Sequence, residues 1–249
     1  MSERTRKVVY ALIGGIVLLG AIEAVGLTGV AGLTWPPLSA SVGYLIDPVN
    51  TRLLTDALVA TISAAGIGAL IGILAGAILA IIALQIAALR PGLDRTAVLA
   101  EAMPAIAIAP FLALTVGRDA TPMIIPAFGV GFIIYLSLNS GFANISTARQ
   151  DVFTALGASR RGRFIRLQLP SVLPNVFDGL ALAAPVAVVG AMIGEFFGAS
   201  RGLGVLVISA MDNFQIPLLW SAAILSVGCS LLAYAILTLL QRRVRGRFA

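Results

Sequence analysis

The sequence contains no histidine, one cysteine and one lysine, and each of these shortages excludes a class of chemistry. Without histidine the chain lacks the usual acid–base group of neutral pH and the commonest metal ligand. The lone Cys229 cannot form an intrachain disulfide or a thiolate metal cluster. The lone Lys7 lies near the N-terminus, so the chain has no internal G-x-x-x-x-G-K-[ST] phosphate-binding loop. We therefore expect no cofactor in this chain and no ATP hydrolysis through a P-loop of its own.

Charge is also scarce, because charged residues make up 11% of the chain while a soluble domain carries about 25%. Hydrophobic residues make up 59%, and the mean hydropathy is +1.01. A spanning helix needs about 20 mostly apolar residues. Six runs meet or approach that length: Val8–Leu27, Ala57–Leu89, Ala97–Val116, Met123–Ile145, Val172–Phe197 and Leu218–Leu240. The sequence predicts an all-α polytopic membrane protein with about six transmembrane helices.

The few basic residues are distributed unevenly between the loops. If the N-terminus lies in the cytoplasm, fourteen of the seventeen Lys and Arg residues fall in inner segments. The positive-inside rule then predicts cytoplasmic N and C termini, and it explains the net charge of +6 without a nucleic-acid partner. The long apolar stretch in residues 1–33 favours an uncleaved anchor helix over a signal peptide. The short apolar stretch Leu203–Met211 predicts a re-entrant or interfacial helix.

Glycines and acids within the apolar runs give further expectations. Two glycine trios repeat every four residues, which favours close packing within the chain over a subunit interface: Gly68, Gly72 and Gly76, and Gly190, Gly194 and Gly198. Carboxylates are costly at membrane depth and usually face a cavity, a hydrogen-bond partner or the interface. Of the acids in these runs, we take three as candidates for lining a polar pathway: Glu101, Asp178 and Glu195. An interfacial or hydrogen-bonded acid is the alternative for each.

The cytoplasmic segment 145–170 carries five arginines and predicts a helix, a break and a second helix. Gly157 can adopt the left-handed conformation that ends a helix, and Ser159 can cap the next one. Pro170 is expected to end that second helix. Aromatic side chains on such a pair need a lipid or protein surface to cover them.

The spacing in this segment resembles the EAA loop of ABC-importer permeases: E-A-A, three residues, a glycine, nine residues, then I-x-L-P. The corresponding residues here are Asp151–Phe153, Gly157 and Leu167–Pro170. Asp151 replaces the glutamate, and Val152-Phe153 replace the two alanines. The gap lengths, the glycine and the Leu-Pro pair match.

Further segments resemble permeases of the nitrate/sulfonate/taurine group. Trp35–Ala40 is similar to their L-P-S-P-x-A segment, and Glu195–Gly204 to their E-F-x-G-x-x-x-G-L-G signature. Pro104 and Pro110 resemble the prolines of their third span. The resemblance runs from about Trp35 to the C-terminus.

The resemblance implies a type I ABC importer permease fold in one domain, residues 1–249, with core helices in 54–249 and a cytoplasmic coupling loop at 145–170. It also implies a place in the bacterial inner membrane and a pathway for a small solute. The implied partners are two ATPase subunits that carry ATP and Mg, a second permease copy as a homodimer, a periplasmic or lipid-anchored binding protein, and membrane lipid. The implied ATPase-coupling residues are Asp151, Phe153, Leu156, Gly157, Ala158, Ser159, Arg160, Arg161, Phe164, Leu169 and Pro170.

Two other functions fit the residues alone. One is a stand-alone carrier or channel that uses the intramembrane acids, and the other is a membrane scaffold without a pathway. The sequence shows no matching pair of broken helices in its two halves, which argues against a carrier built from inverted repeats. The subgroup that the chain resembles handles small anions and pyrimidine-type vitamin precursors, and the spans offer acids rather than bases for an anion.

Overall fold

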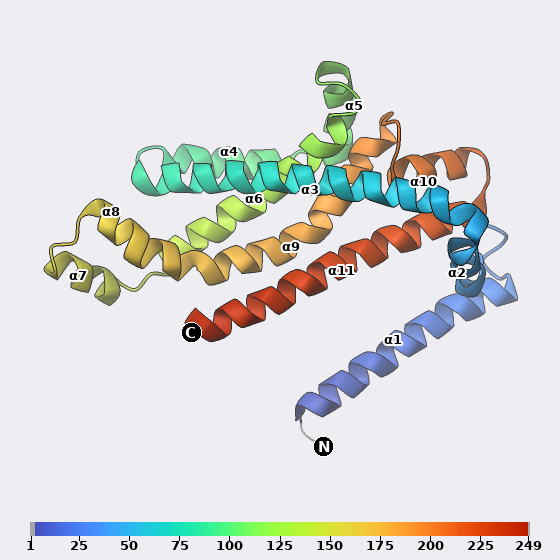
Figure 1. Ribbon diagram of the computed structural model, residues 1–249, viewed down its shortest axis with the longest axis horizontal. Helices are drawn as coiled ribbons and strands as arrows, with labels where there is room; N and C mark the ends of the chain where they lie inside the picture. Colours follow the sequence, from blue (N-terminus) through green and yellow to red (C-terminus); the bar gives the residue numbers. More distant parts are fainter. Residues whose placement is uncertain (1–2, 249) are drawn as a thin grey trace.

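The computed structural model describes residues 3–248, and the regular structure in them is helical throughout (Figure 1). In chain order the helices are α1 Glu3–Thr28, α2 Leu38–Ile46, α3 Pro48–Gln85, α4 Arg90–Ala102, α5 Ala105–Thr115, α6 Thr121–Ala143, α7 Thr147–Ala155, α8 Arg160–Arg163, the π-helical turn η1 Phe164–Gln168, α9 Leu169–Phe196, α10 Leu203–Asp212 and α11 Ile216–Phe248. The predicted short helix after the fifth run is present as α10.

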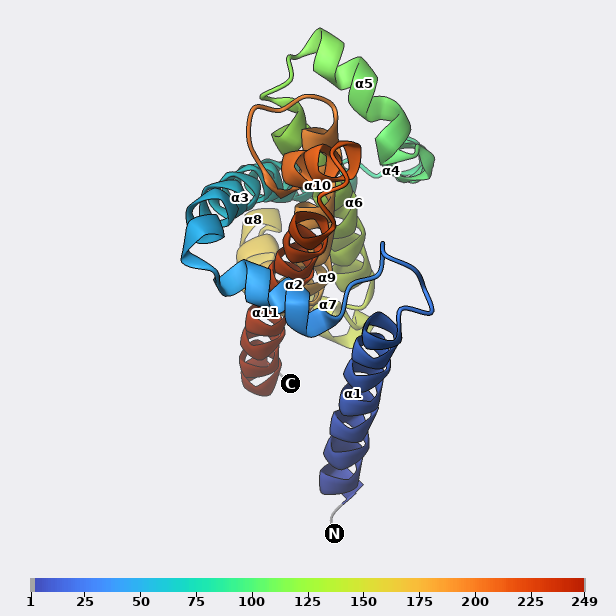
Figure 2. The same ribbon diagram turned by 90° about the vertical axis from the view of Figure 1, so that its right-hand side faces the viewer.

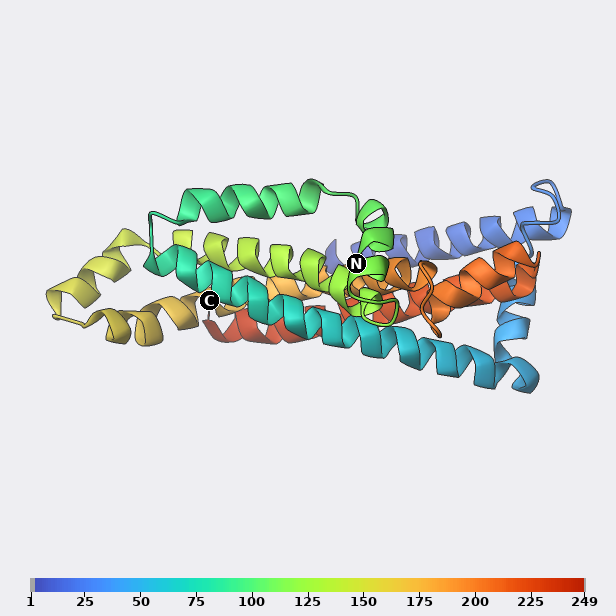
Figure 3. The ribbon, with the colours of Figure 1, turned by 90° about the horizontal axis from the view of Figure 1, so that it is seen from above.

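Five of the six predicted spans are confirmed as helices long and apolar enough to cross a membrane. They are Thr5–Thr28, Pro48–Gln85, Thr121–Ala143, Arg160–Phe196 and Ile216–Val244. A sixth span is present only if α4 and α5 together count as one. The helices α3, α6, α9 and α11 run side by side as a bundle (Figures 1 and 3).

The predicted third span, Ala97–Val116, is bent rather than one straight helix. The helix breaks between α4 and α5, and the two halves meet at 95°. Met103 is extended there, with ψ of 121°, because the residue before a proline is disfavoured in the helical region. Pro104 then forms the N-cap of α5. The first half, α4, contacts the bundle through a hydrogen bond in which the Tyr135 hydroxyl of α6 donates to Asp94 Oδ1 across 2.6 Å.

The first glycine trio packs within the chain, as expected. Gly68, Gly72 and Gly76 of α3 are buried against the backbone of α6. A Cβ atom at Gly72 would lie 2.6 Å from the Ala127 carbonyl oxygen and 2.9 Å from the Gly131 nitrogen. This contact holds α3 and α6 closer together than larger residues allow.

The second trio behaves in the same way at two of its three positions. Gly190 and Gly194 of α9 pack against Pro126 and Pro122 of α6. The expectation for Gly198 is wrong, because that residue lies beyond the end of α9 with φ of 104°. Its positive φ ends the helix there rather than continuing a packing face.

The helix α1 diverges from the bundle and attaches to it at its C-terminal end (Figure 2). The carboxylate of Glu23 accepts hydrogen bonds from the Ser39 nitrogen, at 3.0 Å, and the Ser39 hydroxyl, at 2.6 Å, in the first turn of α2. The ring of Trp35 meets Trp220 of α11 edge to face, with centroids 4.9 Å apart. The apolar window of α1 itself is unburied, which suits a helix facing lipid.

The prediction that Pro170 ends a helix is also wrong. The chain stays helical from α8 through η1 into α9, and Pro170 lies in the first turn of α9. In the π turn, the Leu169 nitrogen donates to the Phe164 carbonyl five residues back. This wider turn rearranges the hydrogen bonds beside a residue that cannot donate one, so the helix passes through the proline.

Candidate functional site

The helices α7 and α8 form a turn that projects from one end of the bundle (Figure 1). Gly157 has φ of 65°, and its nitrogen donates to the Thr154 carbonyl across 3.0 Å. The Ser159 hydroxyl accepts from the Gly162 nitrogen across 3.1 Å and so caps α8. The predicted break at Gly157 and cap at Ser159 are therefore present, and together they set the angle between the two helices.

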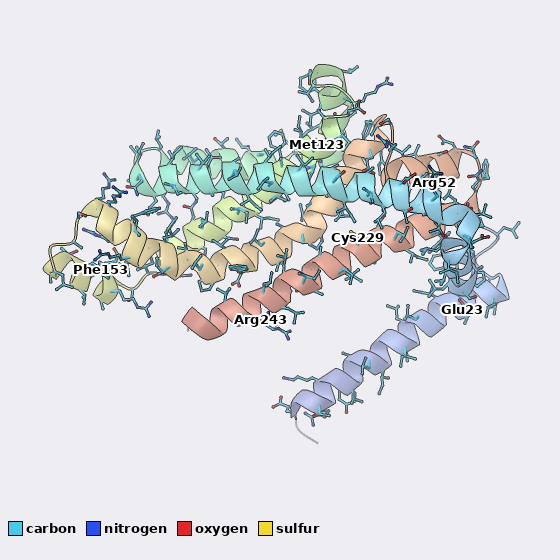
Figure 4. All side chains as sticks on the ribbon, in the orientation of Figure 1. Glu23, Arg52, Met123, Phe153, Cys229 and Arg243 are labelled. Carbon is cyan, nitrogen blue, oxygen red and sulfur yellow. The ribbon has the colours of Figure 1, made fainter. Side chains whose placement is uncertain are left out.

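The apolar side chains of this turn point in two directions. Phe153 is half-buried and packs against the bundle core, and Figure 4 labels its position on α7. Leu156 is 77% exposed, and Val152, one helical turn earlier, is 56% exposed. Val152 was not among the predicted coupling residues, although its spacing of four from Leu156 places both on one helix face. The unpaired apolar surface of α7 is therefore centred on Val152 and Leu156.

Arg160 points back toward the bundle. Its Nη2 donates to the carbonyl oxygen of Gln85, the last residue of α3, across 2.6 Å. The last carbonyls of a helix lack partners within the helix and carry partial negative charge, so a cation there is favourable by about 0.3–1 kcal/mol. Sequence reasoning did not find Gln85, because nothing local links it to a residue 75 positions away.

The other predicted coupling residues lie on or beside the same turn. Asp151, Arg161 and Leu169 are exposed, while Ala158, Phe164 and Pro170 are half-buried. The turn thus presents both charge and apolar surface at the end of the molecule.

The three predicted pathway acids lie in three separate places. Glu195 is 2% exposed at the end of α9, where its Oε2 accepts from the Thr61 hydroxyl of α3 at 3.0 Å and the Gly204 nitrogen of α10 at 2.8 Å. The Thr61 hydroxyl in turn accepts from the Leu203 nitrogen across 2.8 Å. One buried carboxylate therefore joins α3, α9 and the first turn of α10.

The backbone of Gly202 lies close to the Glu195 carboxylate. Its φ of 143° is a conformation that side chains rarely adopt, and a Cβ atom would collide with the Glu195 carboxylate. Neither Thr61 nor Gly202 was among the predicted site residues, although the glycine lies inside the motif that starts at Glu195. The signal that could have found Gly202 is this motif's requirement for glycine.

Glu195 also borders a polar cavity of about 560 Å³ between α3, the start of α6 and the link from α9 to α10. Charged and hydroxyl side chains line it, among them Asp56, Ser63, Asp119, Ser200 and Arg201. We call this polar cavity the outer cavity. It lies toward the end of α3 that is opposite the α7–α8 turn.

Glu101 lies elsewhere, on the exposed side of α4, where it borders an open apolar cavity of about 860 Å³. This apolar cavity is lined by residues of α4, α5, α6 and α9. Asp178 is half-buried on α9 and accepts from the Gln241 side chain of α11 across 2.7 Å. It therefore links two spanning helices.

Residues 68–246 match the family described as the inner membrane component of binding-protein-dependent transport systems. The chain belongs to this family. It is the permease subunit of a binding-protein-dependent ABC transporter, an inner membrane protein and a transport subunit rather than an enzyme. The resemblance to ABC-importer permeases is thereby confirmed.

Individual relatives agree with the family assignment. The permease is 31% identical over 169 residues to a probable ABC transporter permease protein of Haemophilus influenzae, covering 68% of this chain and 69% of the relative. It is 29% identical over 170 residues to the formylaminopyrimidine transport permease protein ThiX of Halalkalibacterium halodurans, covering 68% of each. It is 25% identical to the putative aliphatic sulfonates transport permease protein SsuC of Bacillus subtilis, over 72% of this chain and 63% of the relative.

The fold is also similar to that of one chain in a solved transporter structure. A chain in the inward-facing MetNI methionine ABC transporter superposes with a TM-score of 0.61 at 19% identity. The match covers 78% of this permease and 95% of that chain. At this identity the similarity speaks for the arrangement of helices alone.

Proposed function

We propose that the α7–α8 turn is the surface on which this permease receives a separate ATPase subunit. The observation that carries the proposal is the pair Val152 and Leu156, 56% and 77% exposed, because two large apolar side chains on one face of a polar, Arg-rich turn form a patch that a partner protein can cover. Phe153 holds α7 to the bundle from behind this apolar face. Gly157 and Ser159 fix the angle between α7 and α8, so a displacement of α7 also displaces α8.

The remaining coupling residues take supporting roles. Asp151 and Arg161 are exposed beside the apolar face and supply polar contacts at its rim. Ala158 and Phe164 are half-buried and would help to hold the turn against the bundle, and Leu169 and Pro170 begin α9, into which the helical path continues.

The ATP chemistry of the transporter belongs to the partner chains. Two ATPase subunits would bind ATP and Mg, and their closure would displace the α7–α8 turn. A second copy of this permease would complete a homodimer, and a periplasmic or lipid-anchored binding protein would deliver a small solute from outside. The apolar surfaces of the five spans would face the second copy and membrane lipid.

The topology that suits these roles is a type I importer permease fold of six spans, with α4 and α5 together as the bent third. The N-terminal end of α1 and the C-terminal end of α11 both point toward the α7–α8 end of the bundle (Figure 1), which supports a topology with both termini and the turn in the cytoplasm. One transmembrane domain would then comprise residues 1–249, with 1–33 as the anchor, 54–249 as the core and 145–170 as the coupling loop.

The solute pathway would be bordered by the two cavities. Glu195 and the outer cavity lie on the side away from the ATPase, and Glu101 borders the apolar cavity. Asp178 would keep α9 and α11 in register beside the pathway through its bond to Gln241.

The direct test is co-purification of the ATPase with tagged permease. Replacing Leu156→Asp puts a charge at the centre of the apolar face, so the ATPase should be lost from the purified complex while the permease stays folded. The matched control is Val30→Asp, a residue 85% exposed in the link between α1 and α2 at the other end of the molecule. Equal recovery of the ATPase with both variants would contradict the proposal.

A further inference from the structure

The structure of the α7–α8 turn assigns Arg160 a role different from its neighbours. We infer that Arg160 is a positioning residue that ties the ATPase-docking turn to the C-terminus of α3, so that displacement of the turn is carried along α3 to the outer cavity. This inference rests on the proposed docking of the ATPase at α7 and α8.

The first step is the contact itself. Arg160 is the first residue of α8, directly after the cap at Ser159, so its backbone position is set by the turn. Its guanidinium reaches the carbonyl oxygen of Gln85 across 2.6 Å, a short, charge-assisted bond at the negative end of α3. A side chain used in this way faces the bundle rather than the incoming ATPase.

The second step is the length and stiffness of α3. The helix runs without interruption for 38 residues and extends along the bundle from the α7–α8 end toward α2 (Figures 1 and 3). Its last residue, Gln85, and Thr61 lie 24 positions apart on this helix, which is about 36 Å at 1.5 Å per residue. The glycine contacts with α6 keep the helix backbone tightly supported over this stretch.

The third step is the far end. The Thr61 hydroxyl of α3 holds both the buried carboxylate of Glu195 and the Leu203 nitrogen of α10. The outer cavity is lined by Ser63 of α3 together with Glu195 and the link to α10. A shift of α3 therefore changes the shape of the outer cavity. This helix supplies part of the cavity wall, through Ser63, and also the Thr61 hydroxyl that binds Glu195 and the Leu203 nitrogen.

The test uses the full transporter, permease with its ATPase, in nanodiscs and compares nucleotide-free complex with complex trapped by ATP and vanadate. The native thiol is removed by Cys229→Ala, and one new cysteine is introduced at a time. Ser63→Cys reports the outer cavity through its rate of labelling by a membrane-impermeant maleimide. Ala155→Cys, exposed on α7, reports docking through its protection by the ATPase.

In the parent background, trapping should change the labelling rate of Ser63→Cys by about tenfold, which lies within the 5- to 150-fold range that is typical of coupling between two sites. In Arg160→Ala the protection of Ala155→Cys should remain, while the nucleotide-driven change at Ser63→Cys is lost. Arg160→Lys keeps a charged donor on a flexible stem and should restore part of the change. The matched control is Arg166→Ala, an exposed arginine of η1, which should behave as the parent.

Three results would overturn the inference while leaving the docking proposal intact. In the first, the nucleotide-driven change in labelling rate at Ser63→Cys persists in Arg160→Ala. In the others, the parent shows no such change, or both Arg160 variants lose the protection of Ala155→Cys. If Ala155→Cys is unprotected in the parent complex, the docking proposal itself fails and the inference fails with it.

Discussion

The Thr61 hydroxyl donates to Glu195 Oε2 across 3.0 Å, although the two residues are 134 positions apart in the sequence. Both side chains are buried, with Thr61 at 0% and Glu195 at 2% exposure. Thr61 also accepts from the Leu203 nitrogen, so its single hydroxyl serves both hydrogen bonds. This pair fixes α10 to the bundle through the Leu203 and Gly204 nitrogens, and Glu195 also lines the outer cavity.

Replacing Thr61→Val removes the hydroxyl and keeps the shape of the side chain. The Leu203 nitrogen and the buried Glu195 carboxylate each lose a partner, and a buried group left unpaired costs about 1–3 kcal/mol. We expect a lower midpoint of thermal unfolding for the purified permease in detergent. The control is Thr55→Val, whose hydroxyl is exposed and bonds only to carbonyls of its own helix. A midpoint for Thr61→Val as high as that of the control would contradict this account.

Gly202→Ala tests the same region through the backbone. The added methyl group would collide with the Glu195 carboxylate, and φ of 143° is strained for alanine. We expect reduced expression of folded protein and a lower unfolding midpoint, measured by size-exclusion chromatography and thermal unfolding. Gly228→Ala is the comparison, because a Cβ there has open space within α11. If the two variants behave alike, Gly202 is not constrained by Glu195.

The contact between α3 and α6 predicts a contrast between two nearby glycines. Gly72→Ala forces a methyl group against the Ala127 carbonyl and the Gly131 nitrogen, and such overpacking costs about 1–3 kcal/mol. Gly66→Ala meets open space and should stabilise the helix by about 0.5–1 kcal/mol. The free energies of unfolding of the two variants should therefore shift in opposite directions, and a loss of similar size in both would refute the close approach.

The turn between α7 and α8 requires a residue that tolerates a positive φ. Gly157→Val places a β-branched residue at φ of 65°, which costs about 1–3 kcal/mol and favours another path for the chain. We expect the ATPase to be largely lost from the purified complex. Gly43→Val is the control, since that glycine of α2 has open space around it and lies away from the turn. Full ATPase recovery with Gly157→Val would show that the angle of the turn is unimportant for docking.

Much of this architecture could be predicted from local sequence because its causes are local. Apolar runs long enough to span a membrane gave the correct helices in five cases. The left-handed glycine at Gly157 and the serine cap at Ser159 depend on residues within the same turn, and both are present. The packing of Gly68, Gly72 and Gly76 followed from their regular spacing.

The features that sequence reasoning missed depend on distant parts of the chain or on the balance between competing helical geometries. The break before Pro104 was not predicted from the apolar composition of Ala97–Val116, because hydropathy carries no information on the direction of the backbone. Pro170 does not stop its helix, since a π turn accommodates it. The bonds of Arg160 to Gln85 and of Thr61 to Glu195 join residues far apart in sequence, so no local pattern contains them.

The central claim is that this permease moves a solute only when separate ATPase subunits drive it, and reconstitution in proteoliposomes tests that claim directly. The measurement is uptake of the solute carried by the partner binding protein, with permease alone and with permease plus ATPase. The account predicts no uptake by the permease alone under a proton or sodium gradient, and uptake when ATPase, ATP and loaded binding protein are all present. Gradient-driven uptake by the permease alone would contradict it and favour a carrier that uses the intramembrane acids.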